Sequence, residues 1–71
     1  MKNKRIKGLK KIFNYKIKRF NREGLTSKDD SLYLKSCLEL AIYGMQQATT
    51  EEKYNNIVNH LIIIFKEYDN Q

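Results

Sequence analysis

The chain has 71 residues and a formal net charge of +6, and a core of this size seldom contributes more than about 3 to 5 kcal/mol without disulfides, a metal or self-association. Its one cysteine, Cys37, excludes an intrachain disulfide and favours a buried thiol in a reducing compartment. The longest apolar run, Leu61–Phe65, is far shorter than the roughly 20 residues of a transmembrane helix. We therefore expect one cytoplasmic domain over residues 1–71, completed by formation of a homodimer.

The first segment, residues 1–23, combines most of the positive charge with a helical period. It holds ten Lys or Arg residues and one carboxylate, a net charge of +9, whereas the remaining 48 residues hold four cations and seven carboxylates, a net charge of −3. Apolar residues recur every three or four positions, which predicts one buried stripe: Ile6, Leu9, Phe13, Ile17 and Phe20. The opposite side of this amphipathic helix carries Lys4, Lys7, Lys11, Tyr15, Lys18 and Arg22.

A first helix boundary is predicted at Gly24, which suits a left-handed C-terminal cap. Thr26 or Ser27 is the expected N-cap of the second helix, over residues 28–48. This segment is apolar around more than half of its circumference, so we expect it to contact neighbours on two sides. Its expected stripe consists of Leu34, Cys37, Leu38, Ala41, Met45 and Ala48, widened by Tyr33, Leu40 and Ile42.

A second boundary is predicted at Thr49, because Glu52 stands three residues later in the spacing of a capping box. The third helix, over residues 51–68, then forms an antiparallel hairpin with the second, and residues 24–71 make up this hairpin. Its apolar face comprises Tyr54, Ile57, Val58, Leu61, Ile64, Phe65 and Tyr68. Three apolar side chains lie outside the stripes and predict a dimer interface or a site for a different protein: Leu32, Tyr43 and Ile63.

An alternative secondary structure remains open for the first segment. Phe13, Tyr15 and Ile17 alternate with polar residues, as in a half-buried strand. The resulting order of strand, helix, helix resembles the ribbon-helix-helix DNA-binding proteins in layout, although no motif of that family is matched. The 3.6-residue period of the apolar residues favours the all-α interpretation, with three helices, over this alternative.

Groups that could carry catalysis or hold a metal are sparse. The acidic pairs Asp29/Asp30 and Glu51/Glu52 fall in predicted first turns, where carboxylates stabilise the helix dipole. His60 has no second His or Cys at the spacing of a metal site, and nothing brings it to Cys37. The sequence therefore predicts a protein that is not an enzyme and that has no metal or cofactor.

The basic face predicts an anionic partner. Like charges at i, i+3 and i, i+4 destabilise an isolated helix by roughly 0.2 to 0.5 kcal/mol per pair. The accumulation of such pairs therefore indicates that the cations serve a function. Nucleic acid is the first expectation, with Tyr15, Asn14 and Asn21 available to bases. A protein partner is the alternative, since small basic helical proteins serve as inhibitors, antirepressors or adaptors. A membrane surface is the third, although Trp is absent.

The richness of the chain in Lys, Asn and Ile is typical of low-GC bacteria and their phages.

Overall fold

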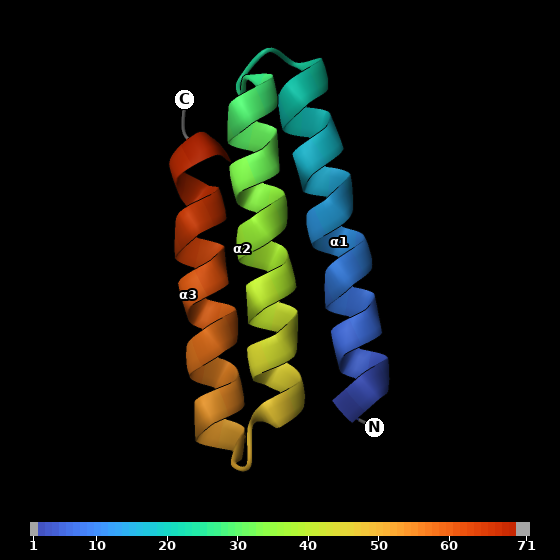
Figure 1. Cartoon of the computed structure of the whole chain (residues 1–71), viewed down its shortest axis with the longest axis vertical. Helices are drawn as coiled ribbons and strands as arrows, with labels where there is room; N and C mark the ends of the chain where they lie inside the picture. Colours follow the sequence, from blue (N-terminus) through green and yellow to red (C-terminus); the bar gives the residue numbers. More distant parts are fainter. Residues whose placement is uncertain (1, 70–71) are drawn as a thin grey trace.

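Three helices run along the full length of the molecule, and each is antiparallel to the next one in the chain, so that α1 and α3 point the same way (Figure 1). The computed structural model describes residues 2–69. Within this range it contains α1 (Lys2–Arg22), α2 (Lys28–Gln47) and α3 (Glu51–Asp69), and no strand. The prediction of an all-α domain with an α2–α3 hairpin is confirmed.

The strand alternative for the first segment is wrong. Residues 13–18 lie in the middle of α1. A strand would place Phe13, Tyr15 and Ile17 on one face, but Phe13 and Ile17 are buried whereas Tyr15 is 59% exposed. The helical stripe is the pattern that buries apolar side chains over five turns, and it therefore determines the structure. The resemblance to the ribbon-helix-helix layout is lost with the strand.

The boundary between α1 and α2 follows the expected capping chemistry. Gly24 has a φ of 76°, and the N–H groups of Gly24 and Leu25 donate to the carbonyls of Asn21 (3.1 Å) and Phe20 (2.9 Å). These two bonds form a Schellman motif, which satisfies carbonyls at the end of α1. Ser27 is the N-cap of α2: its hydroxyl accepts from the Asp30 N–H, and the Asp30 carboxylate accepts from the Ser27 N–H, both at 3.1 Å.

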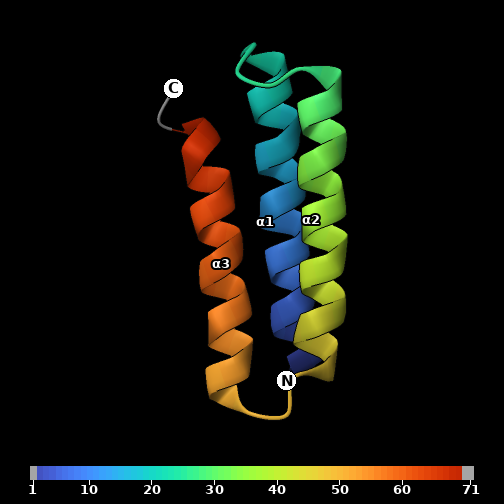
Figure 2. The same ribbon diagram turned by 60° about the vertical axis from the view of Figure 1, so that its left-hand side comes forward.

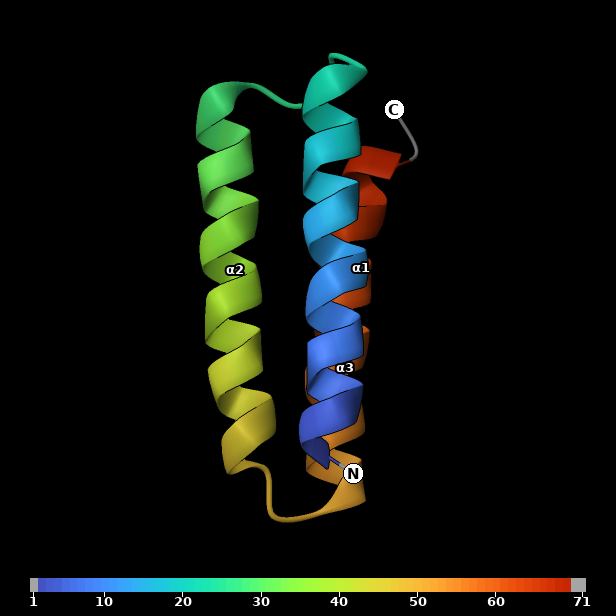
Figure 3. The same cartoon turned by 90° about the vertical axis from the view of Figure 1, so that its right-hand side faces the viewer.

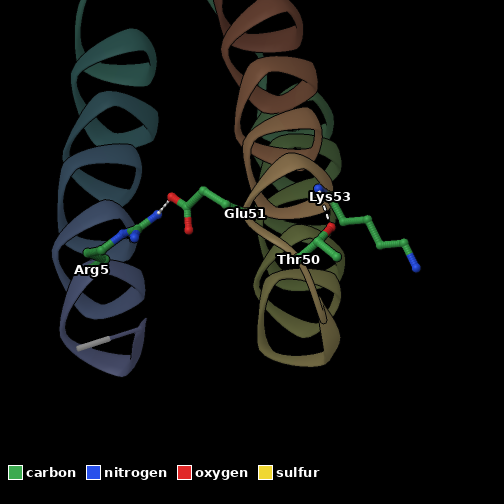
Figure 4. Close-up of polar contacts among 4 residues, drawn as sticks. All are labelled: Arg5, Thr50, Glu51 and Lys53. Atoms are coloured by element: carbon green, nitrogen blue, oxygen red, sulfur yellow. Dashed lines mark hydrogen bonds and ion pairs between the residues drawn. The ribbon is translucent and has the colours of Figure 1, made fainter.

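Helix α3 begins at Glu51, as predicted, but its N-cap is Thr50 and not Thr49. The hydroxyl of Thr50, not that of Thr49, accepts a hydrogen bond from the Lys53 N–H at 3.1 Å (Figure 4). Residues 48–50 form the turn, so α3 begins at Glu51. Because Lys53 has no acceptor to return to the cap, the capping box expected between Thr49 and Glu52 does not form.

The core lies between the three helices and takes side chains from each of them. The stripe predicted for α1 is buried, with Leu9 partly so. Phe13 and Phe20 of α1 meet Phe65 of α3, with ring centroids 4.7 Å and 6.2 Å apart. The buried apolar side chains are Ile6, Phe13, Ile17, Phe20, Leu34, Leu38, Ile42, Met45, Tyr54, Leu61 and Phe65.

Helix α2 contacts neighbours on two sides, as expected, because it packs against both α1 and α3. Figure 2 shows α2 beside α1, and Figure 1 shows it between the other two helices. The prediction of the buried stripe is nevertheless wrong for two of its members, because Tyr33 and Leu40 are 54% and 73% exposed. Both neighbours lie toward the same half of α2, so the edge of its wide apolar surface remains uncovered.

Candidate nucleic-acid interface

The cations of α1 divide into a paired set and an unpaired set. The paired set lies on the flank that faces α3. Arg5 contacts the Glu51 carboxylate at 2.8 Å (Figure 4). At the other end, Asp69 accepts from Arg19 at 2.8 Å and lies 3.8 Å from the Lys16 ammonium. These contacts join the two ends of α3 to α1.

The unpaired set consists of Lys10 and of five cations that lie, together with Tyr15, on the outward surface of α1. We call this surface the basic face: Lys4, Lys7, Lys11, Tyr15, Lys18 and Arg22. All six side chains are exposed, and the sequence-based prediction that they share one surface is confirmed. Within residues 2–69, none of the five cations forms an ion pair. At a rise of about 1.5 Å per residue, the row extends over about 27 Å from Lys4 to Arg22.

A shallow hollow of about 420 Å³ lies in the middle of the basic face. Tyr15 forms part of it, one helical turn from Lys11 and one from Lys18. Asn14 and Lys10 extend the hollow toward the side of α1, and its remaining member is Lys7. Neither Lys10 nor Asn14 belongs to the basic face as predicted from the sequence, although Asn14 was expected to be available to bases.

Lys28, which begins α2, was not part of the predicted site. It lines a groove between α1 and α2 together with Lys18 and Arg22, two members of the basic face. Lys28 follows the N-cap, and only the reversal of the chain at Gly24 brings it beside α1. The sequence offered no direct signal for this proximity.

Asn21, which was expected to be available to bases, has contacts within the fold. Its side-chain amide donates to the Thr26 carbonyl and to the Ser31 hydroxyl, both at 3.4 Å. These bonds hold the loop between α1 and α2 against the start of α2. Asn21 is therefore a structural residue in this molecule.

Helices α2 and α3 expose several large apolar side chains among charged and polar ones. Leu32, Tyr43 and Ile63 are exposed there, so their prediction as uncovered apolar side chains is confirmed. They do not line the groove of about 530 Å³ between the two helices. Its walls are formed by Tyr33, Cys37, Leu40, Ala41, Asn56, Ile57, His60, Leu61 and Ile64.

Cys37 lies in this groove and is partly exposed, which corrects the expectation of a buried thiol. The neighbouring Cys37 thiol raises the pKa of the Tyr33 hydroxyl above its ordinary value. The groove thus contains one thiol, that of Cys37, and one imidazole, that of His60, among mostly apolar side chains.

Residues 2–69 contain no cluster of three or more His, Cys, Asp or Glu side chains that could hold a metal ion. None of the three helices has, over the described residues, the length and apolarity needed to cross a membrane. The absence of catalysis, cofactors and metals stays a prediction.

Comparison with known proteins gives no relative. No protein-family model matches the chain, and neither a curated protein nor a solved structure is detectably similar to it. The surface chemistry of the chain is therefore the basis for a functional proposal.

Proposed function

We propose that this chain is a small regulatory protein of the cytoplasm, without enzymatic activity, that binds nucleic acid through the basic face of α1. The observation that supports this most directly is the division of the α1 cations. Arg5, Lys16 and Arg19 have carboxylate partners, whereas the five cations of the basic face have none within the described residues. An exposed row of unpaired cations is the usual footprint of phosphate binding.

The distribution of carboxylates strengthens this argument. Of the acidic side chains in α2 and α3, only Glu51 and Asp69 form ion pairs with α1 in the described part of the chain, and both do so on the flank. A surface that served solubility alone would tolerate mixed signs along its length. The basic face instead remains uniformly positive from Lys4 to Arg22, a cost to helix stability that contact with phosphates would offset.

The membrane-surface alternative is less compatible with the fold. An interfacial helix inserts its apolar stripe among lipids, but the stripe of α1 is buried against α2 and α3. Helix α1 would have to leave the bundle in order to bind in that way.

The proposal is tested by fluorescence anisotropy with labelled oligonucleotides over a range of salt concentrations. Each phosphate contact contributes roughly −0.9 to the slope of log affinity against log salt for duplex DNA, and roughly −0.7 for single strands. Lys11→Ala and Lys18→Ala should each make the slope shallower by about one contact. Lys66→Ala, on α3, is the matched control and should leave the slope unchanged; equal effects at all three positions would contradict the proposal.

A second candidate is a protein-directed inhibitor, antirepressor or adaptor, which the apolar groove between α2 and α3 favours. Purification from the native host with and without nuclease separates the two functions. Recovery of one stoichiometric protein that survives nuclease and high salt, together with no binding of nucleic acid at low salt, would favour this candidate.

We also propose that the apolar side of α2 and α3 forms a homodimer. The bundle is elongated, 37 × 18 × 16 Å in its principal extents, so its core is small and self-association would add to the apolar area that is buried. Large apolar side chains on this side, including Leu40, Tyr43 and Ile63, supply the chemistry of the dimer interface.

A further inference from the structure

We infer that the occupant of the basic face is a single strand of nucleic acid, RNA or DNA, which lies along α1 with one base stacked on Tyr15. This inference rests on the proposed function and specifies its ligand. It follows from the way α1 is held in the bundle and from the position of Tyr15 in the row of cations.

Helix α1 forms one side of the bundle, so its neighbours cover only its inner face. Figure 3 shows α2 beside it from end to end and α3 behind it. Because the apolar stripe of α1 is buried against these helices, only the outward face can meet a ligand. The exposed cations of that face suit phosphates, and Tyr15 and Asn14 are the groups beside them that can meet a base.

A duplex could receive phosphate contacts from the lysines, but it would leave Tyr15 without a function. The ring is 59% exposed and stands in the middle of the row, between Lys11 and Lys18, as the one member of the basic face that is not a cation. In a duplex, the flat faces of the bases are covered by their neighbours in the stack. In a single strand these faces are free, and an exposed aromatic ring binds them irrespective of sequence.

The surroundings of Tyr15 suit a nucleotide. The hollow of about 420 Å³ beside its ring is walled by four lysines and by Asn14, whose amide has both donors and an acceptor for a base edge. Lys11 and Lys18 lie about 6 Å and 4.5 Å from Tyr15 along the helix axis, one on each side. A strand that follows α1 thus meets a cation, the aromatic ring and a second cation in order. The other exposed aromatic side chains among the described residues, Tyr33 and Tyr43, lie on α2, away from this row.

The test compares three ligands at one salt concentration by fluorescence anisotropy: oligouridylate as RNA, the same sequence as DNA, and a mixed-sequence DNA duplex. Each is about 15 nucleotides long, within the usual range of single-strand site sizes. We expect at least one of the two single strands to bind about ten-fold or more tightly than the duplex. The RNA and DNA arms differ only at the 2′-hydroxyl and at no base, so a difference between them identifies the natural form of the strand.

Substitutions of Tyr15 separate stacking from charge. Tyr15→Ala should weaken binding of the preferred single strand by about 5- to 150-fold, the range for loss of one base–aromatic stack, and should leave the salt slope unchanged. Tyr15→Phe keeps the ring and should retain the wild-type affinity. Ile12→Ala, at another exposed position of α1 but on the side of the groove toward α3, is the matched control and should bind normally.

The possible failures are distinguishable. Duplex binding as tight as single-strand binding, or an unchanged affinity for Tyr15→Ala, would overturn this inference and leave the proposed function standing. Absence of binding to all three ligands at low salt would overturn the proposed function itself. Circular dichroism confirms that each variant is folded, which is expected because Tyr15 and Ile12 are on the surface.

Discussion

Arginine and lysine have different roles on α1. The Arg5 guanidinium lies 4.2 Å from the centre of the Tyr54 ring and 2.8 Å from Glu51, and the hydrogen bond with Glu51 raises the pKa of Arg5. Arg19 likewise contacts Asp69 and lies 5.4 Å from the centre of the Phe20 ring. A planar guanidinium can stack and form a directed ion pair at once, which an ammonium does less well. The basic face consists mostly of lysines, which bind as mobile point charges.

Tyr54 offers a test of the packing between α1 and α3. Its hydroxyl is buried near the Arg5 guanidinium, but it makes no hydrogen bond of acceptable geometry among the described residues. Burial of an unpaired hydroxyl costs roughly 1 to 3 kcal/mol in proteins, so Tyr54→Phe should increase the free energy of unfolding by about 1 kcal/mol. Urea denaturation measures this change. A loss of stability would show that the hydroxyl makes a bond that stabilises the fold.

Tyr68 offers a test of stability against pH. Burial, followed by the nearby Asp30 and Glu67 carboxylates, raises the pKa of the Tyr68 hydroxyl. Ionisation is therefore easier in the unfolded chain than in the folded one. The stability that this difference contributes is complete below the unfolded pKa of about 10 and is lost as the pH rises through the higher folded pKa.

This prediction is tested by comparing the free energy of unfolding in urea at about pH 9 and about pH 11, on either side of the ordinary tyrosine pKa. Tyr68→Phe should lose less stability between these two values than the wild type does. Tyr43→Phe, at an exposed position of α2, is the matched control and should lose as much as the wild type. Identical losses in all three proteins would contradict the prediction.

At the scale of the elements, the helices could be predicted because their stripes are local patterns. Ile6 to Phe20 recur at helical spacing and are buried at that spacing, and Ser27 with Asp30 caps α2 within four residues. The N-cap of α3 was less predictable, because Thr49 and Thr50 are both good caps and the length of the turn decides between them. The exposure of Leu40 could not be predicted, since it depends on where α1 and α3 pack around α2.

Two glycines give opposite predictions for replacement by alanine. Gly24→Ala should lower the free energy of unfolding by about 1 kcal/mol or more, because a φ of 76° is unfavourable for a residue with a Cβ. Gly8→Ala should raise it by about 0.5 to 1 kcal/mol, because Gly8 is within α1 and a Cβ there would meet no atom within 4 Å. Thermal unfolding of both variants decides the matter; a stabilised Gly24→Ala would exclude the left-handed cap.

At the scale of the whole molecule, the proposed homodimer predicts a thermal stability that depends on protein concentration. Because dimerisation couples folding to mass action, the melting temperature of the wild type should rise with protein concentration. Leu40→Ser should remove this dependence and sediment as a monomer of 8.5 kDa, since Leu40 is the most exposed of the large apolar side chains described. Ile12→Ser, at an exposed apolar position of α1, is the control.

A wild type that sediments as a monomer at tens of micromolar would contradict the homodimer. The groove between α2 and α3 would then be a site for a different protein, and the second candidate function would gain support.

The candidate site was partly predictable for the same reason as the helices. Members of the basic face are neighbours on one helix, so their spacing alone places them together. The ion pairs of Arg5 and Arg19, and the approach of Lys28, depend on residues that are distant in the chain. No local pattern distinguishes a cation that will meet a carboxylate of α3 from one that will not.

The opposite charges of the two halves have a consequence for kinetics. Residues 1–23 carry a net charge of +9 and the remaining 48 residues carry −3, and α1 forms one side of the bundle. The molecule therefore has a large electric dipole across its short dimension. Near a polyanion, this dipole turns α1 toward the ligand before the two make contact, so fewer encounters fail through wrong orientation. Added salt should consequently slow association more than it hastens dissociation.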